Sequence, residues 1–514
     1  MRNQIKWGSI LSYVQMAANV LINLLFTPIM LRLLGSSEYG LYNTVVSTIS
    51  MLSILSLGFN SGYIRYYAKY KAENDEESIS KLNGLFLTIF FVIGFVALLC
   101  GAFLSFNLDI VFDNGLTERE YEIARVLMLL LTFNLAVQFP TSVFRSIISA
   151  QEKYIFLKVA AILKSLFGPM ASIILLLMGF RSIAMVLALV VFHIVDDIVH
   201  IYYAFKKLKI KVSFGKLEKG LFRSLFIYTI FIAINMLVDQ INWNVGKIIL
   251  GRYRGTTAVS IYAVAYTIST SYNLFSTSIS GVFTPRIHKF ISTAKDALQI
   301  KERVTSLFVR VGRIQFLILA LVSSGIVFYG KQFITEFWAG KDYSQSYYVL
   351  LLLILPATVP LMQNIGIEVQ RAQNKHQFRS IVYLFMAAIN LSISIMLSQR
   401  YGAVGAATGT ATSMLIANGV VMNIYYHKKC NIDILLFWKN ILGMLKGLIL
   451  PVIFGVASLY IFNTQTLLGF AASVLCYTVV YSVSMWILVM NDSEKMLITV
   501  PLKKILRKIG CVKV

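Results

Sequence analysis

The sequence predicts an all-α polytopic membrane protein with about 14 transmembrane helices, arranged as two parallel six-helix bundles around a central cleft plus two C-terminal helices. Composition, the length of the apolar runs and an internal repeat support this fold class. Hydrophobic residues make up 57% of the 514 residues and charged residues only 14%, whereas soluble domains carry about 25% charged residues. Apolar runs of ~18 residues or more recur along the chain, and each is long enough to cross a bilayer core ~30 Å thick.

The predicted helices are these apolar runs, each bounded by a short polar or charged segment. Met1 to Trp7 forms a short basic head, and the apolar run that follows is too long for a signal-peptide core, so we interpret it as an uncleaved first span. The predicted helices cover residues 8–34, 40–66, 84–106, 123–148, 155–178, 182–205, 224–250, 257–284, 307–330, 346–368, 378–399, 403–426, 437–462 and 465–490.

The placement of lysine and arginine predicts that both termini are cytoplasmic, because short cytoplasmic loops collect positive charge. With the N-terminus inside, most of the 47 Lys and Arg residues fall on the cytoplasmic side, notably in "KKLKIKVSFGKLEKGLFR" (206–223) and "KKILRKIG" (503–510). The acidic segment "DIVFDNGLTEREYE" (109–122) falls outside. The net charge of +24 is therefore spread over many cytoplasmic segments. Such a spread is typical of contact with anionic membrane lipids, and we expect no nucleic-acid partner.

The chain repeats itself after about 220 residues, which predicts two bundles of the same orientation. "TPIMLRLLGSSEYGLY" (27–42) aligns with "KIILGRYRGTTAVSIY" (247–262), so that Arg32 matches Arg252 and Gly35 matches Gly255. "AQEKYIF" (150–156) returns as "AQNKHQF" (372–378). Each unit holds an even number of spans, so both enter the membrane in the same sense. We therefore expect domains at residues 1–215 and 216–430, followed by two extra helices and a basic cytoplasmic tail at 431–514.

The run "P-x-x-L-R-x-L-G-x-x-x-Y-G-L-Y" of residues 28–42, the "R-A-Q-N-K" of 371–375 and the 12+2 spans resemble a known group. They are similar to the polysaccharide (Wzx-type) flippases of the multidrug/oligosaccharidyl-lipid/polysaccharide exporter superfamily. The resemblance implies a bacterial inner-membrane carrier that works by alternating access. Its cargo would be undecaprenyl-pyrophosphate-linked oligosaccharide, moved from the inner to the outer leaflet for cell-surface polysaccharide biosynthesis. A polysaccharide polymerase and chain-length machinery are further candidate partners.

Charged residues within the predicted helices are candidate functional groups, because a charge at a helix centre costs ~2.5–3.5 kcal/mol on insertion scales. Lys164 lies deep in the fifth predicted helix, and Asp196 and Asp197 lie at nearly the same depth in the sixth. Either a structural ion pair or a substrate-binding cleft cation explains Lys164, and the carboxylates are candidates for ion coupling. The matching residue in the second half is Met386, so the lysine is not a repeated packing feature.

Two polar stripes occupy corresponding helices, with spacings of three and four residues that keep each stripe on one helix face. Gln15, Asn19 and Asn23 form the first stripe, and Asn235, Asp239 and Asn242 form the second. They either hydrogen-bond between helices or line a sugar-binding surface, and Asp239 is a further ion-coupling candidate. Three arginines near helix ends, Arg32, Arg65 and Arg252, are substrate-binding candidates that snorkelling to the headgroups also explains.

Other transporters of the same superfamily share these features, so a multidrug antiporter and a lipid II flippase remain alternatives. A membrane polysaccharide polymerase is disfavoured, because the longest outer loop carries acids but no catalytic constellation. The chain has no nucleotide-binding phosphate loop, and the four cysteines have no metal, redox or disulfide spacing. We therefore expect a transporter and not an enzyme, with no cofactor and no metal.

Overall fold

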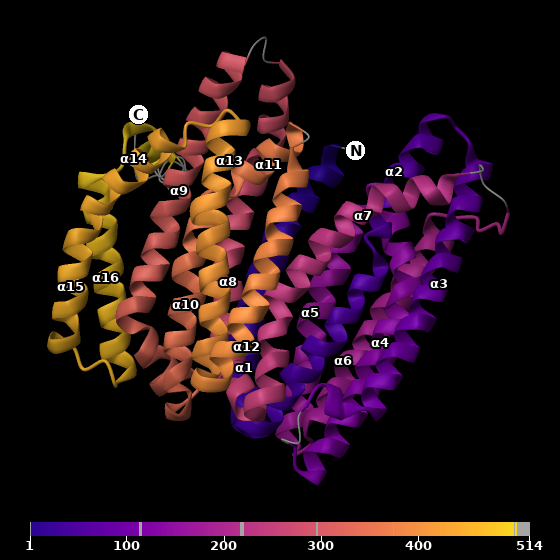
Figure 1. Cartoon of the computed structure of the whole chain (residues 1–514), viewed down its shortest axis with the longest axis horizontal. Coiled ribbons are helices and arrows are strands. Elements are labelled where there is room, and N and C mark those ends of the chain that lie inside the picture. The colour runs from indigo at the N-terminus through magenta and orange to yellow at the C-terminus, as the bar shows by residue number, and fades with distance from the viewer. Residues whose placement is uncertain are drawn as a thin grey trace, which may run out of the picture. The chain divides into compact units, whose positions relative to one another are not determined.

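The structure, a computed structural model, consists of helices and short connecting segments (Figure 1). It describes residues 2–112, 116–215, 220–293, 297–373, 375–497 and 499–500, so the predicted tail at 503–510 lies outside the described residues. The chain forms two compact units. Unit 1 holds residues 1–268 and 377–413, and unit 2 holds residues 269–376 and 414–514. The predicted domains are defined by the sequence repeat instead, and their boundaries stay a prediction.

Unit 1 is built from long helices that pack side by side, with α3 against α4 and α1 against α5. Its elements are α1 (Arg2–Met51), η1 (Leu52–Ser56), α2 (Phe59–Ala72), α3 (Glu76–Phe106), η2 (Leu108–Ile110), α4 (Glu118–Ala150), α5 (Tyr154–Leu177), α6 (Ser182–Tyr202), η3 (Tyr203–Lys207), α7 (Leu221–Gln240), η4 (Ile241–Val245), the first part of α8 (Gly246–Thr293) and most of α12 (His376–Met414).

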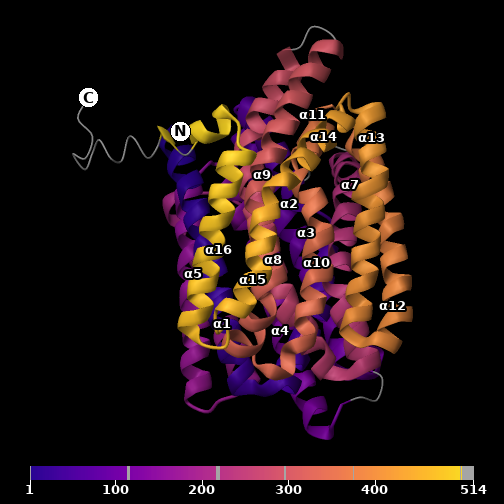
Figure 2. The ribbon, with the colours of Figure 1, turned by 90° about the vertical axis from the view of Figure 1, so that its left-hand side faces the viewer.

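Unit 2 continues from the second part of α8 and includes the C-terminal helices. Its further elements are α9 (Ala297–Gln332), η5 (Phe333–Trp338), η6 (Lys341–Tyr343), α10 (Ser344–Met362), α11 (Ile365–Ala372), η7 (Leu415–Val421), α13 (Met422–Lys429), α14 (Ile434–Met444), η8 (Leu445–Leu448), α15 (Ile449–Ile461) and α16 (Leu467–Leu488). The two C-terminal helices α15 and α16 lie side by side and contact α9 (Figure 2). Arg313 of α9 binds Glu494 with an Nε–Oε1 distance of 2.6 Å, which attaches the segment after α16 to this group.

The backbone repeats a sharp turn at the two aligned glycines. Gly35 inside α1 has φ 81° and ψ 170°, and Gly255 inside α8 has φ 79° and ψ 177°. Residues with a side chain essentially never adopt this conformation. A third left-handed glycine, Gly402, breaks α12. The two halves of the sequence therefore share the backbone conformation of this turn as well as the aligned glycine.

Ten helical elements of the described chain are long and apolar enough to cross a membrane, or eleven if one bent pair counts as a span. Three of these elements contain the turns at Gly35, Gly255 and Gly402, and each is long enough for two crossings. If each of these three elements is counted as two membrane spans, the number of spans rises from eleven to about fourteen, which is the predicted number. The all-helical membrane fold class is thus confirmed.

Aromatic side chains form the core where α2, α3 and α4 meet. Tyr63 packs edge-on against Phe86 with 5.2 Å between ring centroids, and Phe90 stacks on Phe139. The Tyr63 hydroxyl donates a 2.7 Å hydrogen bond to Asn83, which is 2% exposed. This bond satisfies a polar group that is costly to bury alone.

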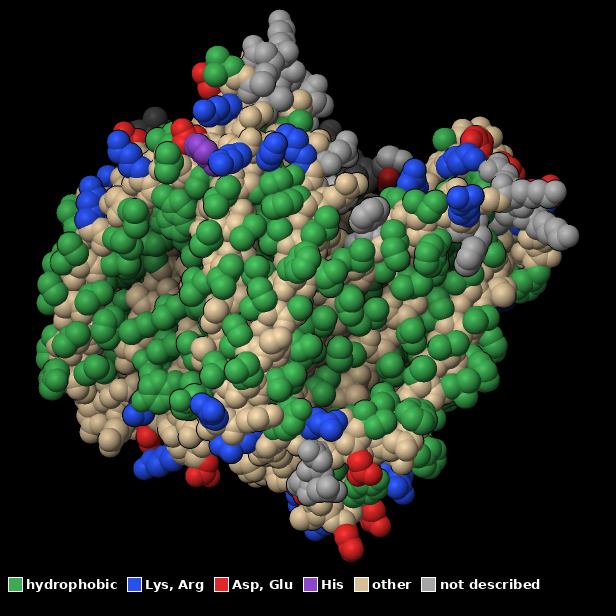
Figure 3. All heavy atoms as spheres, viewed as in Figure 1, with side chains coloured by type: hydrophobic (Ala, Val, Ile, Leu, Met, Phe, Trp, Pro, Cys, Tyr) green, Lys and Arg blue, Asp and Glu red, His purple; other side chains and the backbone are tan. Residues whose placement is uncertain are grey.

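Hydrophobic side chains cover the sides of the helices, and charged side chains gather at the helix ends (Figure 3). Leu99, Phe103, Leu177 and Ile487 are more than half exposed although they are fully apolar. A soluble surface does not tolerate such wide apolar exposure, whereas lipid tails solvate it.

Candidate functional site

A buried ion cluster lies in unit 1, where α4, α5 and α6 meet. Asp196 and Asp197 of α6 are 8% and 2% exposed. Arg145 of α4 donates to both, with an Nη2–Oδ2 distance of 2.9 Å to Asp196. Lys164 of α5 lies 3.5 Å from the same Asp196 oxygen. Two cations thus balance two carboxylates, as burial of charge in a bilayer requires.

Two histidines of α6 extend this cluster. Nδ1 of His200 lies 2.6 Å from the Asp196 carbonyl oxygen and 3.4 Å from its carboxylate. Nδ1 of His193 lies 2.9 Å from the amide nitrogen of Gln138 and 3.2 Å from that of Asn134. The side of α6 that carries these histidines and the two aspartates therefore faces α4 and α5. Among the described residues, no group of three or more His, Cys, Asp or Glu is arranged to hold a metal ion.

A cavity of about 160 Å³ adjoins the cluster between α1, α5 and α6. Its polar lining comes from Asn19 and Asn23 of α1, Lys164 and Ser165 of α5, and His193 of α6. The structure thus brings Lys164 together with Asn19 and Asn23 of the first polar stripe, which the sequence analysis had selected on separate grounds. One ammonium, two amides, a hydroxyl and an imidazole can donate hydrogen bonds to an anion or to sugar hydroxyls.

The polar stripes make equivalent contacts in the two halves. Lys158 of α5 donates to the Gln15 side chain at 3.3 Å, and Ser380 of α12 donates to Asn235 at 3.0 Å. Asn390 of α12 also donates to Asn242 at 3.1 Å. Hydrogen bonds between neighbouring helices thus involve Gln15, Asn235 and Asn242. A sugar-binding role for the stripes stays a prediction.

The remaining candidates lie apart from the cluster. The Asp239 carboxyl interacts electrostatically with Arg379 of α12. Arg65 of α2 lies 4.5 Å from the centre of the Tyr228 ring, and Arg252 donates to the Ile110 carbonyl at 2.5 Å. Arg32 is exposed near the Gly35 turn. Their roles in substrate binding stay predictions.

Sequence reasoning missed Arg145 and Lys247. Arg145 lies in the last turns of a predicted helix, where an arginine is easily interpreted as one of the basic residues that set membrane orientation. Two buried carboxylates beside a single lysine leave one negative charge unbalanced. That imbalance could have predicted a second cation near Asp196 and Asp197. Lys247 is 6% exposed and its ammonium lies 3.9 Å from the centre of the Tyr266 ring. Aromatic faces stabilise cations in this way.

Comparisons with known proteins agree with this architecture. Residues 6–291, more than half of the chain, match the family described as polysaccharide biosynthesis protein. The capsular polysaccharide biosynthesis protein CapF of Staphylococcus aureus is 24% identical over 229 residues. That match covers 44% of this chain and 55% of CapF, so the chain spans about half the length of this relative.

Solved structures with the same fold include membrane transporters. The lipid II flippase MurJ, in an inward closed conformation, has a TM-score of 0.68 at 17% identity, covering 93% of this chain and 97% of MurJ. An inward-facing multidrug resistance MATE family transporter of the MOP superfamily has a TM-score of 0.66 at 13% identity, covering 84% and 99%.

These comparisons confirm the resemblance predicted from residues 28–42 and 371–375. They show a multi-pass membrane protein with the fold of known membrane transporters. The chain belongs to the polysaccharide biosynthesis protein family and has the fold of the MOP superfamily.

Proposed function

We propose that this transporter flips a lipid-linked oligosaccharide from the inner to the outer leaflet of the bacterial plasma membrane, by alternating access, for cell-surface polysaccharide biosynthesis. The observation that carries the proposal is the cavity beside Lys164, in a chain of the polysaccharide biosynthesis protein family. A cargo linked through undecaprenyl pyrophosphate presents both an anion and sugar hydroxyls. The residues around that cavity offer partners for both.

Lys164 is the proposed cation for the pyrophosphate. Arg145 already binds both aspartates, whereas Lys164 reaches Asp196 only at 3.5 Å. That distance is long for a charge-assisted hydrogen bond, which is ordinarily about 2.7–2.9 Å. Lys164 can therefore turn to an incoming phosphate while Arg145 stays bound to Asp196 and Asp197, and a proton taken up by one aspartate would balance the charge that Lys164 leaves. Protonation of either aspartate is the proposed point of ion coupling.

Asn19, Asn23 and His193 are the proposed partners of the sugar or of the remaining phosphate oxygens. A volume of about 160 Å³ holds part of a headgroup and not a whole oligosaccharide. We propose that the rest of the cargo occupies the cleft that the repeat predicts, with the lipid tail in the bilayer. Cytoplasmic termini, contact with anionic lipids and cooperation with a polysaccharide polymerase and chain-length machinery belong to the same proposal.

Transport by the full-length protein in liposomes tests the cargo class. Fluorescent undecaprenyl-pyrophosphate-linked oligosaccharide, lipid II and a cationic dye would be supplied in parallel, and accessibility of each label to an added quencher would report its movement. Movement of the lipid-linked oligosaccharide above protein-free liposomes supports the proposal. Movement of lipid II alone would make the chain a lipid II flippase. Movement of the dye alone would make it a multidrug transporter.

A further inference from the structure

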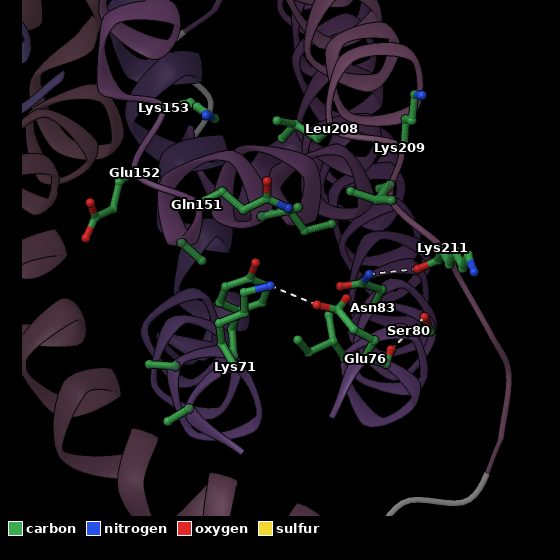
Figure 4. Close-up of a pocket in the computed structure, with 17 residues that line it drawn as sticks. Lys71, Glu76, Ser80, Asn83, Gln151, Glu152, Lys153, Leu208, Lys209 and Lys211 are labelled. Carbon is green, nitrogen blue, oxygen red and sulfur yellow. Dashed lines mark hydrogen bonds and ion pairs between the residues drawn. The ribbon is translucent and has the colours of Figure 1, made fainter. Parts of the chain in front are cut away.

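A second and larger pocket lies at one end of unit 1, separate from the ion cluster. Its volume is about 780 Å³, within the range of pockets that hold small molecules. Four segments meet there: the end of α2, the start of α3, the turn between α4 and α5, and residues 208–211 after η3 (Figure 4). By the predicted orientation this end of the unit is cytoplasmic.

Four lysines and two glutamates line this pocket, which leaves it basic. They are Lys71, Lys153, Lys209, Lys211, Glu76 and Glu152. Lys71 and Glu76 neutralise each other at 2.8 Å. Figure 4 shows the Glu152 side chain directed away from the other labelled side chains. Lys153, Lys209 and Lys211 form no ion pair with a described carboxylate, so three positive charges surround the opening without a described counter-ion.

Neutral polar groups complete the lining. Gln151 points into the pocket from the α4–α5 turn (Figure 4). Asn83 is fixed at the pocket wall, because it accepts from Tyr63 and donates a 2.8 Å hydrogen bond to the Lys211 carbonyl. The segment after η3 is held against α3 in the same way, since the Ser213 amide donates to the Ser80 carbonyl at 3.0 Å. The lysines on this segment therefore keep their place beside the pocket.

We propose that this pocket binds the phosphate group of an anionic ligand. Lys209 and Lys211 extend outward from the edge in Figure 4, and their flexible four-carbon stems allow them to turn over a phosphate at the opening. Gln151 donates to the phosphate oxygens from inside. Two sources supply this chemistry: the headgroup of an anionic membrane lipid and a small soluble phosphate ester. The bound ligand connects α2, α3, the α4–α5 turn and the segment after η3.

Binding to the purified full-length protein in a neutral detergent tests this site and separates the two sources. Short-chain phosphatidylglycerol and sn-glycerol 3-phosphate would be titrated separately, with native mass spectrometry counting bound molecules and a thermal-unfolding shift giving the affinity. Saturable binding of the lipid alone identifies a headgroup site. Binding of both ligands, in competition, identifies a site for phosphate esters in general. Failure of both to bind would overturn the proposal.

Two variants distinguish a built pocket from general surface charge. The triple variant Lys153→Gln, Lys209→Gln, Lys211→Gln should weaken binding by roughly fivefold for each lysine removed. The matched control Lys428→Gln, Lys429→Gln, Lys439→Gln removes three exposed lysines of unit 2 and should bind like the wild type. Ala68→Trp fills the pocket from an exposed position of α2 without changing its charge, and should also abolish binding. Unchanged binding by the pocket triple or by Ala68→Trp, or an equal loss in the control, would refute the site.

Discussion

The contact of α1 with α5 and the contact of α7 with α12 occupy matching places in the repeat, and they differ in one important respect. In both, the first helix carries an amide that accepts a hydrogen bond from the second: Gln15 from Lys158, and Asn235 from Ser380. Deeper along the second helix, however, Lys164 corresponds to Met386. The duplicated framework is shared, whereas the buried cation occurs in one half.

The same asymmetry holds for Arg145, which corresponds to Ile367 in the alignment of the two repeats. Burial of a charge in a membrane costs free energy. If these positions served only to pack the helices, we would expect apolar residues at them in both halves. We infer that the backbone turns and interhelical amides serve the fold, and that the ion cluster of one half serves transport. Each prediction below tests one side of this distinction.

Arg145→Leu should have the largest effect on stability. It removes the cation that contacts both buried aspartates and leaves Lys164 alone with two carboxylates. Loss of one partner from a buried ion pair costs about 3–5 kcal/mol. The free energy of unfolding in detergent should fall by that amount, and addition of Asp197→Asn should restore part of it. Ile367→Leu, at the matching position, is the control and should change little. Wild-type stability of Arg145→Leu would contradict the charge balance described here.

Gly40→Ala tests the close approach of the two repeats. An added Cβ would lie 1.8 Å from the Thr256 carbonyl oxygen, a backbone atom that cannot turn aside. Overpacking of this kind costs about 1–3 kcal/mol. Thermal unfolding should show a clear loss of stability, whereas Gly325→Ala, where the added Cβ meets nothing within 4 Å, should be neutral or stabilising. Equal stability of the two variants would mean that the helices do not meet at Gly40.

Gly35→Ala and Gly255→Ala should each cost about 1–3 kcal/mol, because alanine is strained at their backbone angles. Neither added Cβ meets another atom within 4 Å, so strain is the main term at both sites. The two losses, measured as changes in the free energy of unfolding, should agree closely. A large loss at one glycine and none at the other would break the structural equivalence of the repeats.

The sequence was sufficient to predict the membrane fold, because apolar runs of membrane length and an aligned glycine pair are local signals. Gly35 and Gly255 could be matched by aligning the two halves of the sequence, and their backbone angles agree within 10°. The sequence did not reveal the break at Leu57, which has φ 48°, nor the separation of α10 from α11 where one helix was predicted. Gly58 follows Leu57, and Pro360 lies just before the end of α10. Membrane helices tolerate glycine and proline in their interiors, so neither residue alone predicted a break.

The candidate site could be predicted only in part, for a similar reason. Lys164, Asp196 and Asp197 stood out because charges are rare in apolar helices, and the structure brings them together. Arg145 approaches them from a third helix, α4. It lies near the end of that helix, where an arginine ordinarily serves only to set the orientation of the helix in the membrane. Which helices contact one another decides between the two interpretations, and that information is tertiary.

Gln15→Leu and Asn235→Leu should have the smallest effects on stability. Each removes one interhelical hydrogen bond, which is worth about 0.6 kcal/mol on average within a membrane. The two losses in the free energy of unfolding should be similar, because the bonds occupy matching positions. If Gln15→Leu also slows transport while Asn235→Leu does not, the first stripe contacts cargo in addition to its role in packing.

The most direct test of the account is an exchange of the lysine for the residue that the other half carries. Lys164→Met and the matched control Met386→Leu would be compared for flipping of the lipid-linked oligosaccharide in proteoliposomes, with thermal unfolding confirming that both are folded. We predict a loss of about tenfold or more for Lys164→Met, the range expected for removal of a charge-assisted hydrogen bond, and wild-type flipping for Met386→Leu. Equal flipping by both folded variants would contradict the claim that Lys164, the cation found in one half only, binds the cargo.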